Sequence, residues 1–301
     1  MGAPPEPLPS PPSRRACLVV PASAPEKLAK AARLGADEVV IDLEDAVVPG
    51  AKEAARAAAA EAVGALDWSG VALAVRVNAP GTPWCHEDLA ALAGAGPALR
   101  SVVMPKVEGA EDVAFAERLL DGAEAAADRA LPLRVQALVE TAKGVARVQT
   151  IAGASRRLEA LIVGYADLAV SLGRTAAGAA DLGLWDPVRE AVLLAARAHG
   201  LQAVDGPHLG LSPDESFHAA AGRAREQGFD GKWAIHPSQL APLRERFSPS
   251  EAEVAHAHAV VEALAAAEAA GEGAVALDGR MLDEPVRLAA LRVLTAAGER
   301  R

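Results

Sequence analysis

Aromatic residues are scarce in this chain of 301 residues: phenylalanine, tryptophan and tyrosine together make up only 3 %. Hydrophobic residues nevertheless make up 51 %, so a core must be built mostly from alanine, valine and leucine. Cysteine is scarce too. Cys17 and Cys85 show neither a pairing pattern nor metal-ligand spacing, which argues against a disulfide framework. We therefore expect reduced thiols and a cytoplasmic protein.

Positive charge is in the minority, because the formal net charge is −10. This balance argues against nucleic acid or an anionic membrane surface as partner, although it leaves room for a local basic pocket that binds a phosphate-bearing ligand. The proline-rich residues 1–15 contain no apolar signal core, and we expect them to be disordered. The alanine-rich run near 254–270 includes His256 and Glu262 and does not read as a membrane span.

Short apolar runs recur along the chain, and a helical pattern follows each of them. The runs are CLVVPA (17–22), EVVIDLED (38–45), LAVRVNA (73–79), SVVMPKV (101–107), RVQALVET (134–141), ALIVGYAD (160–167), QAVDGP (202–207) and GKWAIHP (231–237). Near-continuous apolar runs are typical of parallel strands covered on both faces. Eight strands alternating with helices predict an α/β fold, a (β/α)8 TIM barrel over residues 16–247. A doubly wound open sheet is the alternative, but no glycine-rich dinucleotide fingerprint follows the first strand.

The alternation stops near residue 247. Residues 248–301 read as a long helix with Ser248 or Ser250 as its N-cap, a glycine-containing segment, and a last helix near 285–298. We interpret this tail as a C-terminal helical extension of the barrel.

Polar residues gather where the predicted strands end, which is where TIM-barrel enzymes carry their chemistry. Glu140 and Asp167 end adjacent strands at equivalent positions, so their carboxylates are expected to converge. Two carboxylates at close range repel unless they share a proton or a cation. Two carboxylates completed by substrate oxygens and water suit Mg²⁺. Both a shared proton and a shared Mg²⁺ stay open at this point.

Arg76 ends a strand on the same side of the predicted barrel. Its planar guanidinium suits a substrate carboxylate, and Mg²⁺ together with Arg76 would bind a 2-oxo acid. The chemistry suggested is cleavage or formation of a carbon–carbon bond next to that acid. His236, which precedes Pro237, suits a structural role and a ligand contact equally well.

Several motifs, in order from about residue 16 to 297, resemble the citrate lyase β-subunit-like proteins of the HpcH/HpaI aldolase and citrate lyase superfamily, relatives of the malyl-CoA and citramalyl-CoA lyases. The motifs are LVVPASAPEKLAKAARLGADEVVIDLEDAV (18–47), VRVNAPGT (75–82), VMPKVEGAEDV (103–113), ALVETAKGV (137–145), GYADLAVSLG (164–173), GFDGKWAIHPSQL (228–240) and DGRMLDEPV (278–286).

The resemblance implies a Mg²⁺-dependent TIM barrel that acts on acyl-CoA thioesters and assembles as a homotrimer or hexamer. Glu140 and Asp167 match the metal-binding carboxylates, and Arg76 matches the arginine that holds the 2-oxo acid. Asp283 matches the acid/base of the CoA lyases, on a C-terminal lid that reaches a neighbouring subunit. Two further groups of matches are the supporting residues Glu44, Asp45 and Lys106, and the candidates for CoA phosphates, Arg14, Arg15, Lys27 and Lys30.

From these observations we expect a lyase acting on a citryl-, malyl- or citramalyl-type CoA ester, with small-molecule partners and no nucleic acid or membrane. Two alternatives stay open. One is a malyl-CoA thioesterase, and the other is the β subunit of a citrate lyase complex that acts on an acyl carrier protein.

Overall fold

The computed structural model describes residues 12–175 and 182–299. The predicted disorder of residues 1–11 therefore lies outside the described residues. Residues 13–15, which were also expected to be disordered, are instead held in place before the first strand. Ser13 and Arg15 donate hydrogen bonds to Asp37, and Arg14 donates to Glu38.

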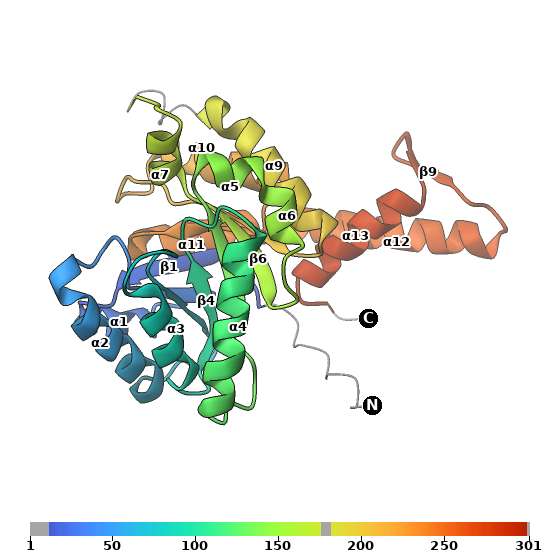
Figure 1. Cartoon of the computed structure of the whole chain (residues 1–301). Helices are drawn as coiled ribbons and strands as arrows, with labels where there is room; N and C mark the ends of the chain where they lie inside the picture. The colour runs from blue at the N-terminus through green and yellow to red at the C-terminus, as the bar shows by residue number, and fades with distance from the viewer. Residues whose placement is uncertain (1–11, 176–181, 300–301) are drawn as a thin grey trace. The chain divides into compact units, whose positions relative to one another are not determined.

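Eight parallel strands close into a barrel in chain order, with the last strand pairing to the first (Figure 1). They are β1 (Ala16–Pro21), β2 (Glu38–Asp42), β3 (Ala72–Arg76), β4 (Leu99–Met104), β5 (Arg134–Val139), β6 (Leu158–Val163), β7 (Gln202–Asp205) and β8 (Gly231–Ala234). The predicted TIM barrel is confirmed, and the open-sheet alternative is excluded.

One layer of side chains fills the barrel interior, and each strand contributes one member. The layer consists of Cys17, Val40, Ala74, Val103, Leu138, Ile162, Val204 and Trp233. Seven of these side chains are small or aliphatic, as expected for a chain poor in aromatics. Because successive residues of a strand point to opposite faces, residues two positions beyond this layer also point inward. Asp42, Arg76 and Glu140 occupy such positions at the carboxyl end.

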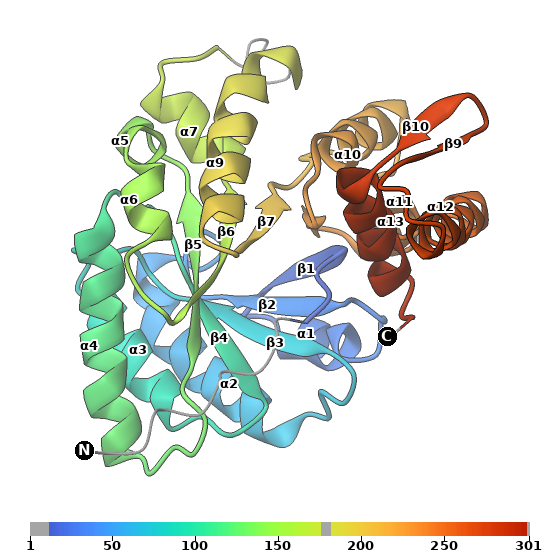
Figure 2. The same ribbon diagram turned by 90° about the vertical axis from the view of Figure 1, so that its right-hand side faces the viewer.

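Helices cover the outside of the barrel and return the chain to the start of each strand, as Figure 2 shows for α4 and α9. They are α1 (Pro25–Ala31), α2 (Lys52–Ala65), α3 (Cys85–Ala93), α4 (Ala110–Ala126), α5 (Ala142–Ala146), α6 (Val148–Ala152), α7 (Tyr165–Ser171), α9 (Asp186–Ala198), α10 (Glu215–Gln227) and α11 (Leu240–Phe247). Three single 3-10 turns are η1 (Pro49–Ala51), η2 (Leu182–Trp185) and η3 (Pro237–Gln239).

Residues from Glu245 onward form a second compact unit. It contains α12 (Glu251–Ala269), a hairpin of β9 (Val275–Leu277) and β10 (Arg280–Leu282), and α13 (Glu284–Ala296). Ser250 caps α12: its side chain accepts from the Glu253 N–H, while Glu253 accepts from the Ser250 N–H. Buried residues of both helices and of the hairpin, among them Val260, Leu282 and Leu294, form this unit's own core. Within the described ranges, no helix is both long enough and apolar enough to cross a membrane.

Candidate active site at the carboxyl end of the barrel

Charged side chains from four β–α connections meet at the carboxyl end of the barrel. This strand-end cluster consists of Glu44 and Asp45 after β2, Lys106 after β4, Glu140 after β5 and Asp167 in α7 after β6. The Nζ atom of Lys106 lies 2.6 Å from Glu44 Oε1, 3.7 Å from Asp45 Oδ1 and 3.7 Å from Asp167 Oδ1. The lysine thereby links carboxylates from three connections.

Glu140 is the most buried member of the cluster, with 3 % of its surface exposed. Burial, as the largest cause, raises the pKa of its carboxyl group to about 8. The negative charges of Glu44 and Asp167 act in the same direction. Lys106 and Arg76 oppose the shift without cancelling it. Ionised Glu140 is therefore short of positive charge in this ligand-free protein.

Gly164 leaves the space that the Glu140 side chain occupies. A Cβ atom at position 164 would lie 2.5 Å from both Cβ and Oε2 of Glu140, far inside normal contact distance. The Gly164 N–H also donates to the Val139 carbonyl, so the two connections lie side by side. The residue directly after β6 must therefore be glycine for Glu140 to keep this position.

Lys106 has a left-handed backbone, with φ of 52°. This conformation is strained for a residue with a side chain and costs about 1–3 kcal/mol. In it, the Lys106 N–H donates to Glu140 Oε1 over 2.9 Å while the ammonium group contacts Glu44. Backbone strain of this kind is found at binding and catalytic sites, where the surrounding structure imposes it.

Arg76 lies beside the cluster and is 8 % exposed. Its Nε and Nη2 donate to the two carboxylate oxygens of Asp42 over 2.7 and 2.6 Å. Its Nη1 lies 2.9 Å from Glu44 and 3.5 Å from Asp45. Asp42 thus uses two of the five guanidinium N–H groups and fixes the plane of the guanidinium. The N–H groups that Asp42 does not use are the ones left to bind a ligand.

The donor set of the cluster fits a magnesium ion. No group of three or more His, Cys, Asp or Glu side chains in residues 12–175 and 182–299 is placed to hold a metal. Glu140 and Asp167 instead supply a pair of electrostatically coupled carboxylates. Mg²⁺ typically binds one or two carboxylates and completes its shell with water and substrate oxygens. A cation would also offset the charge deficit around Glu140. These two residues would hold it.

A cavity of about 490 Å³ adjoins the cluster. Glu44, Asp45 and Lys106 line it from the cluster side. Lys52 and Trp84 also line it, with the ammonium group of Lys52 lying 5.5 Å from the centroid of the Trp84 ring. A substrate bound at the cluster therefore has room to extend beyond it.

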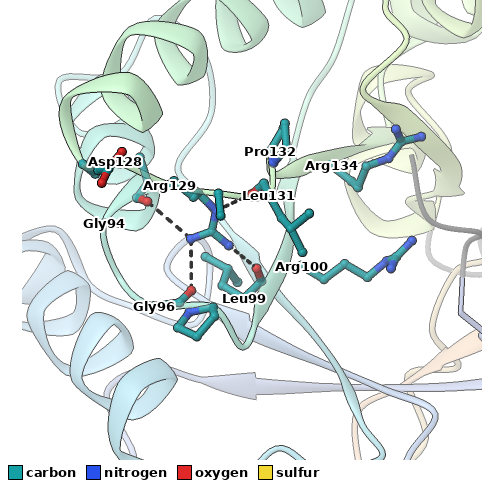
Figure 3. A pocket seen from close by; sticks show the side chains of 13 residues that line it. Gly94, Gly96, Leu99, Arg100, Asp128, Arg129, Leu131, Pro132 and Arg134 are labelled. Carbon is teal, nitrogen blue, oxygen red and sulfur yellow. Dashed lines mark hydrogen bonds between the residues drawn. The ribbon is translucent and has the colours of Figure 1, made fainter. Parts of the chain in front are cut away.

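A second cavity, of about 400 Å³, lies at the amino ends of β4 and β5, between the α3–β4 and α4–β5 connections (Figure 3). Arg129 ties its wall together by donating to the carbonyls of Ala93, Gly96 and Leu99. None of the expected site residues lines this cavity.

The expected CoA contact of Arg14 does not fit its position. Arg14 precedes β1 at the amino end of the barrel and is 1 % exposed. Its guanidinium donates to Glu38, Gln202 and Glu159, which leaves no surface for a phosphate. Its neighbour Arg15 is also at this end, paired with Asp37. We therefore withdraw both arginines as CoA-binding candidates.

Lys27 and Lys30 are exposed on α1, which begins just after the carboxyl end of β1, so they stay candidates for CoA phosphates. His236 is exposed and caps η3: its Nδ1 lies 2.8 Å from Ser238 Oγ and accepts from the Ser238 N–H. Asp283 belongs to the second unit and caps α13 by accepting from the Val286 N–H over 3.4 Å. The helix-cap role of Asp283 is thus present, and its catalytic role stays a prediction.

Residues 15–237, which span the barrel, match a family described as HpcH/HpaI aldolase/citrate lyase. The chain belongs to this family. Among its relatives, an L-malyl-CoA/β-methylmalyl-CoA lyase of Cereibacter sphaeroides is 39 % identical over 293 residues, covering 91 % of this chain and 92 % of that protein. A (3S)-malyl-CoA thioesterase of the same species is 37 % identical over 274 residues, covering 89 % of each.

A solved structure of similar fold is CitE from Mycobacterium tuberculosis in complex with magnesium, acetoacetate and coenzyme A. It matches with a TM-score of 0.77 and 37 % identity, over 94 % of this chain and 98 % of that one. The match extends well beyond the barrel strands.

Sequence reasoning overlooked three residues that shape the family site in this chain. Gly164 carries no chemistry, and only a structure reveals the atom that its Cβ would strike. Lys52 was interpreted as a surface residue paired with Arg56, yet it is 5 % exposed and donates to the carbonyls of Leu43 and Glu44. Asp42 was noted as a strand-end acid, but its grip on Arg76 was not foreseen.

Proposed function

We propose that this chain is a Mg²⁺-dependent carbon–carbon lyase that cleaves a 3-hydroxyacyl-CoA thioester to an acyl-CoA and a 2-oxo acid. The observation that carries the proposal is the coupled carboxylate pair Glu140 and Asp167, set beside the fixed guanidinium of Arg76. The CoA-ester lyase among the relatives and the magnesium and coenzyme A bound to CitE support it.

The substrate carries its hydroxyl group on C3, counted from the thioester carbon. Cleavage of the C2–C3 bond turns C3 into the carbonyl carbon of the 2-oxo acid and leaves the electron pair on C2 as a thioester enolate. Mg²⁺, when bound, supplies Lewis-acid polarisation at the oxygen on C3. Arg76 would hold the carboxylate of the 2-oxo acid, with its guanidinium plane preset by Asp42.

Glu44, Asp45 and Lys106 would keep this site in place. Lys106 neutralises part of the charge of the two acids and ties β2's connection to Asp167. With Arg76, it would also contribute positive potential toward the enolate. Lys27 and Lys30 on α1 would contact CoA phosphates. His236 is retained as a possible substrate contact beside its capping role.

Asp283 would deliver the proton to C2 of the enolate and complete the acyl-CoA product. It sits in the second unit, after the β9–β10 hairpin, so we treat the unit from residue 248 onward as a lid that closes on a neighbouring subunit. The active form would accordingly be a homo-oligomer, a trimer or a hexamer. The two free, buried thiols suit a reducing compartment such as the cytoplasm.

Hydrolysis of malyl-CoA is the second candidate, since the thioesterase among the relatives is 37 % identical. The same site would then cleave the thioester itself and release free CoA. Action on an acyl carrier protein, as the β subunit of a citrate lyase complex, is the third. A stand-alone lyase turns over free CoA esters, whereas such a subunit does not.

The test is a screen of citryl-, malyl- and citramalyl-CoA with Mg²⁺, with both 2-oxo acid and free thiol recorded. The lyase proposal expects 2-oxo acid and acyl-CoA in equal amounts from one of the three esters, without free thiol. Free thiol without 2-oxo acid supports the thioesterase. Turnover of none of the free esters, together with turnover of an acyl-carrier-protein ester, supports the subunit.

A further inference from the structure

Two residues before Asp167, the side chain of Tyr165 links three other elements of the barrel. Its hydroxyl donates to Asp205, the last residue of β7. It also accepts a hydrogen bond from Arg189 Nε of α9 over 2.6 Å. Lys232 of β8 contacts the other carboxylate oxygen of Asp205 and donates to the Gly206 carbonyl over 2.6 Å. We call Tyr165, Asp205, Arg189 and Lys232 the tyrosine anchor.

The tyrosine anchor lies outside the barrel interior, between the strands and the helices. Val204 belongs to the interior layer, so the next residue, Asp205, points the other way. Asp205 and Arg189 are 0 % exposed and Lys232 is 1 % exposed. These charges are matched within the protein, because Asp205 pairs with both Lys232 and Arg189. A site without solvent access is unsuited to substrate, and the anchor must act through what it holds.

The ring of Tyr165 is fixed as firmly as its hydroxyl. A Cβ atom on Gly206 would lie 2.9 Å from Cδ2 of the ring, so Tyr165 rests directly on the backbone after β7. Trp185 packs on the ring with a centroid distance of 5.1 Å. Tyr165 is the first residue of α7 and therefore sets where this helix starts.

Helix α7 has only seven residues, and a helix this short takes its orientation from tertiary contacts. Asp167 lies in its first turn, one position after Ala166. The one contact described for the Asp167 carboxylate is a distant one, 3.7 Å from Lys106 Nζ. The position of this carboxylate thus depends on the placement of the helix start.

We infer that Tyr165 is a positioning residue for the metal: the tyrosine anchor sets the start of α7 and so holds Asp167 opposite Glu140. The inference rests on the proposed function, in which Asp167 binds Mg²⁺. Groups that orient metal ligands from behind typically change metal affinity by about 10–100-fold when they are removed.

The test measures Mg²⁺ affinity by isothermal titration calorimetry, together with thermal unfolding, for wild type, Tyr165→Phe and Ser101→Ala. Phenylalanine keeps the ring contacts and leaves the Asp205–Lys232 pair intact. Ser101→Ala is the matched control, because it also deletes one buried hydroxyl, which accepts from Gln136 at the amino end of the barrel. Arg189→Lys is a second variant that keeps the charge beside Asp205 but loses the Nε–H donor to Tyr165.

We expect Tyr165→Phe to raise the Mg²⁺ dissociation constant about tenfold. The Mg²⁺ concentration for half-maximal turnover should rise with it, while turnover at saturating Mg²⁺ changes less. Ser101→Ala should lower the unfolding temperature without changing Mg²⁺ affinity. Unchanged Mg²⁺ affinity in folded Tyr165→Phe, or in Arg189→Lys should the first variant not fold, overturns the inference alone. A wild-type protein that binds no Mg²⁺ overturns the proposed function as well.

Discussion

Replacing Gly164 by alanine tests whether the glycine after β6 exists to accommodate Glu140. The added Cβ would lie 2.5 Å from the Cβ and Oε2 atoms of Glu140, so the carboxylate must move by several tenths of an ångström. Overpacking a filled interior costs about 1–3 kcal/mol. For a domain of this size, such a loss corresponds to an unfolding temperature about 2–10 °C lower.

The effect on function should exceed the effect on stability. A misplacement of about 1 Å in a catalytic arrangement can lower the rate about 100-fold. We therefore expect Gly164→Ala to remain folded, to bind Mg²⁺ more weakly and to lose turnover by about two orders of magnitude. Calorimetric Mg²⁺ titration and steady-state turnover measure the two losses.

Gly122→Ala is the matched control. Gly122 lies within α4, where nothing stands within 4 Å of the new Cβ, so alanine should leave turnover unchanged and stabilise the helix by about 0.5–1 kcal/mol. Wild-type Mg²⁺ affinity and turnover in Gly164→Ala would refute the reasoning, since they would mean that Glu140 need not be where the structure places it.

Three further predictions concern the lid, the guanidinium and the thiols. Asp283→Asn should still cap α13 and fold but lose turnover by orders of magnitude, and mixing it with inactive Glu140→Gln should restore some activity in hybrid oligomers; full activity of Asp283→Asn would leave only the helix cap. Arg76→Lys should weaken 2-oxo-acid binding at least about tenfold, because lysine cannot bridge both Asp42 oxygens; unchanged affinity in a binding titration would make Arg76 purely structural. Burial raises the pKa of the Cys85 thiol to about 12, so at pH 8 only about one molecule in 10⁴ carries the thiolate, and a thiol reagent should label native protein far more slowly than unfolded protein.

The eight strands could be predicted because parallel strands buried on both faces produce apolar runs. The predicted runs continued too far at their carboxyl ends: β2 ends at Asp42, whereas its run continued to Asp45. Those extra residues are polar and lie in the connections, where they build the site. Pattern alone does not separate the end of a strand from the start of a functional loop.

The sequence placed Glu140 and Asp167 at equivalent strand ends, and this was enough to suggest a cation. It did not reveal which strand-end charges face the barrel axis. Asp205 ends β7 in the same way, yet it points outward to Lys232, because one residue along a strand reverses the side. Arg14 was a different failure. Its place before β1 indicated the amino end, and that signal was available from chain order alone.

The central claim is that Glu140, Asp167 and Arg76 form one metal-dependent site for a 2-oxo acid. The most direct measurement is a calorimetric titration of glyoxylate and of pyruvate into wild type and Glu140→Gln, each with Mg²⁺ and with chelator. The account predicts that wild type binds a 2-oxo acid with Mg²⁺ and loses this binding with chelator, and that Glu140→Gln binds weakly under both conditions. Equal affinity of wild type in Mg²⁺ and in chelator would contradict it.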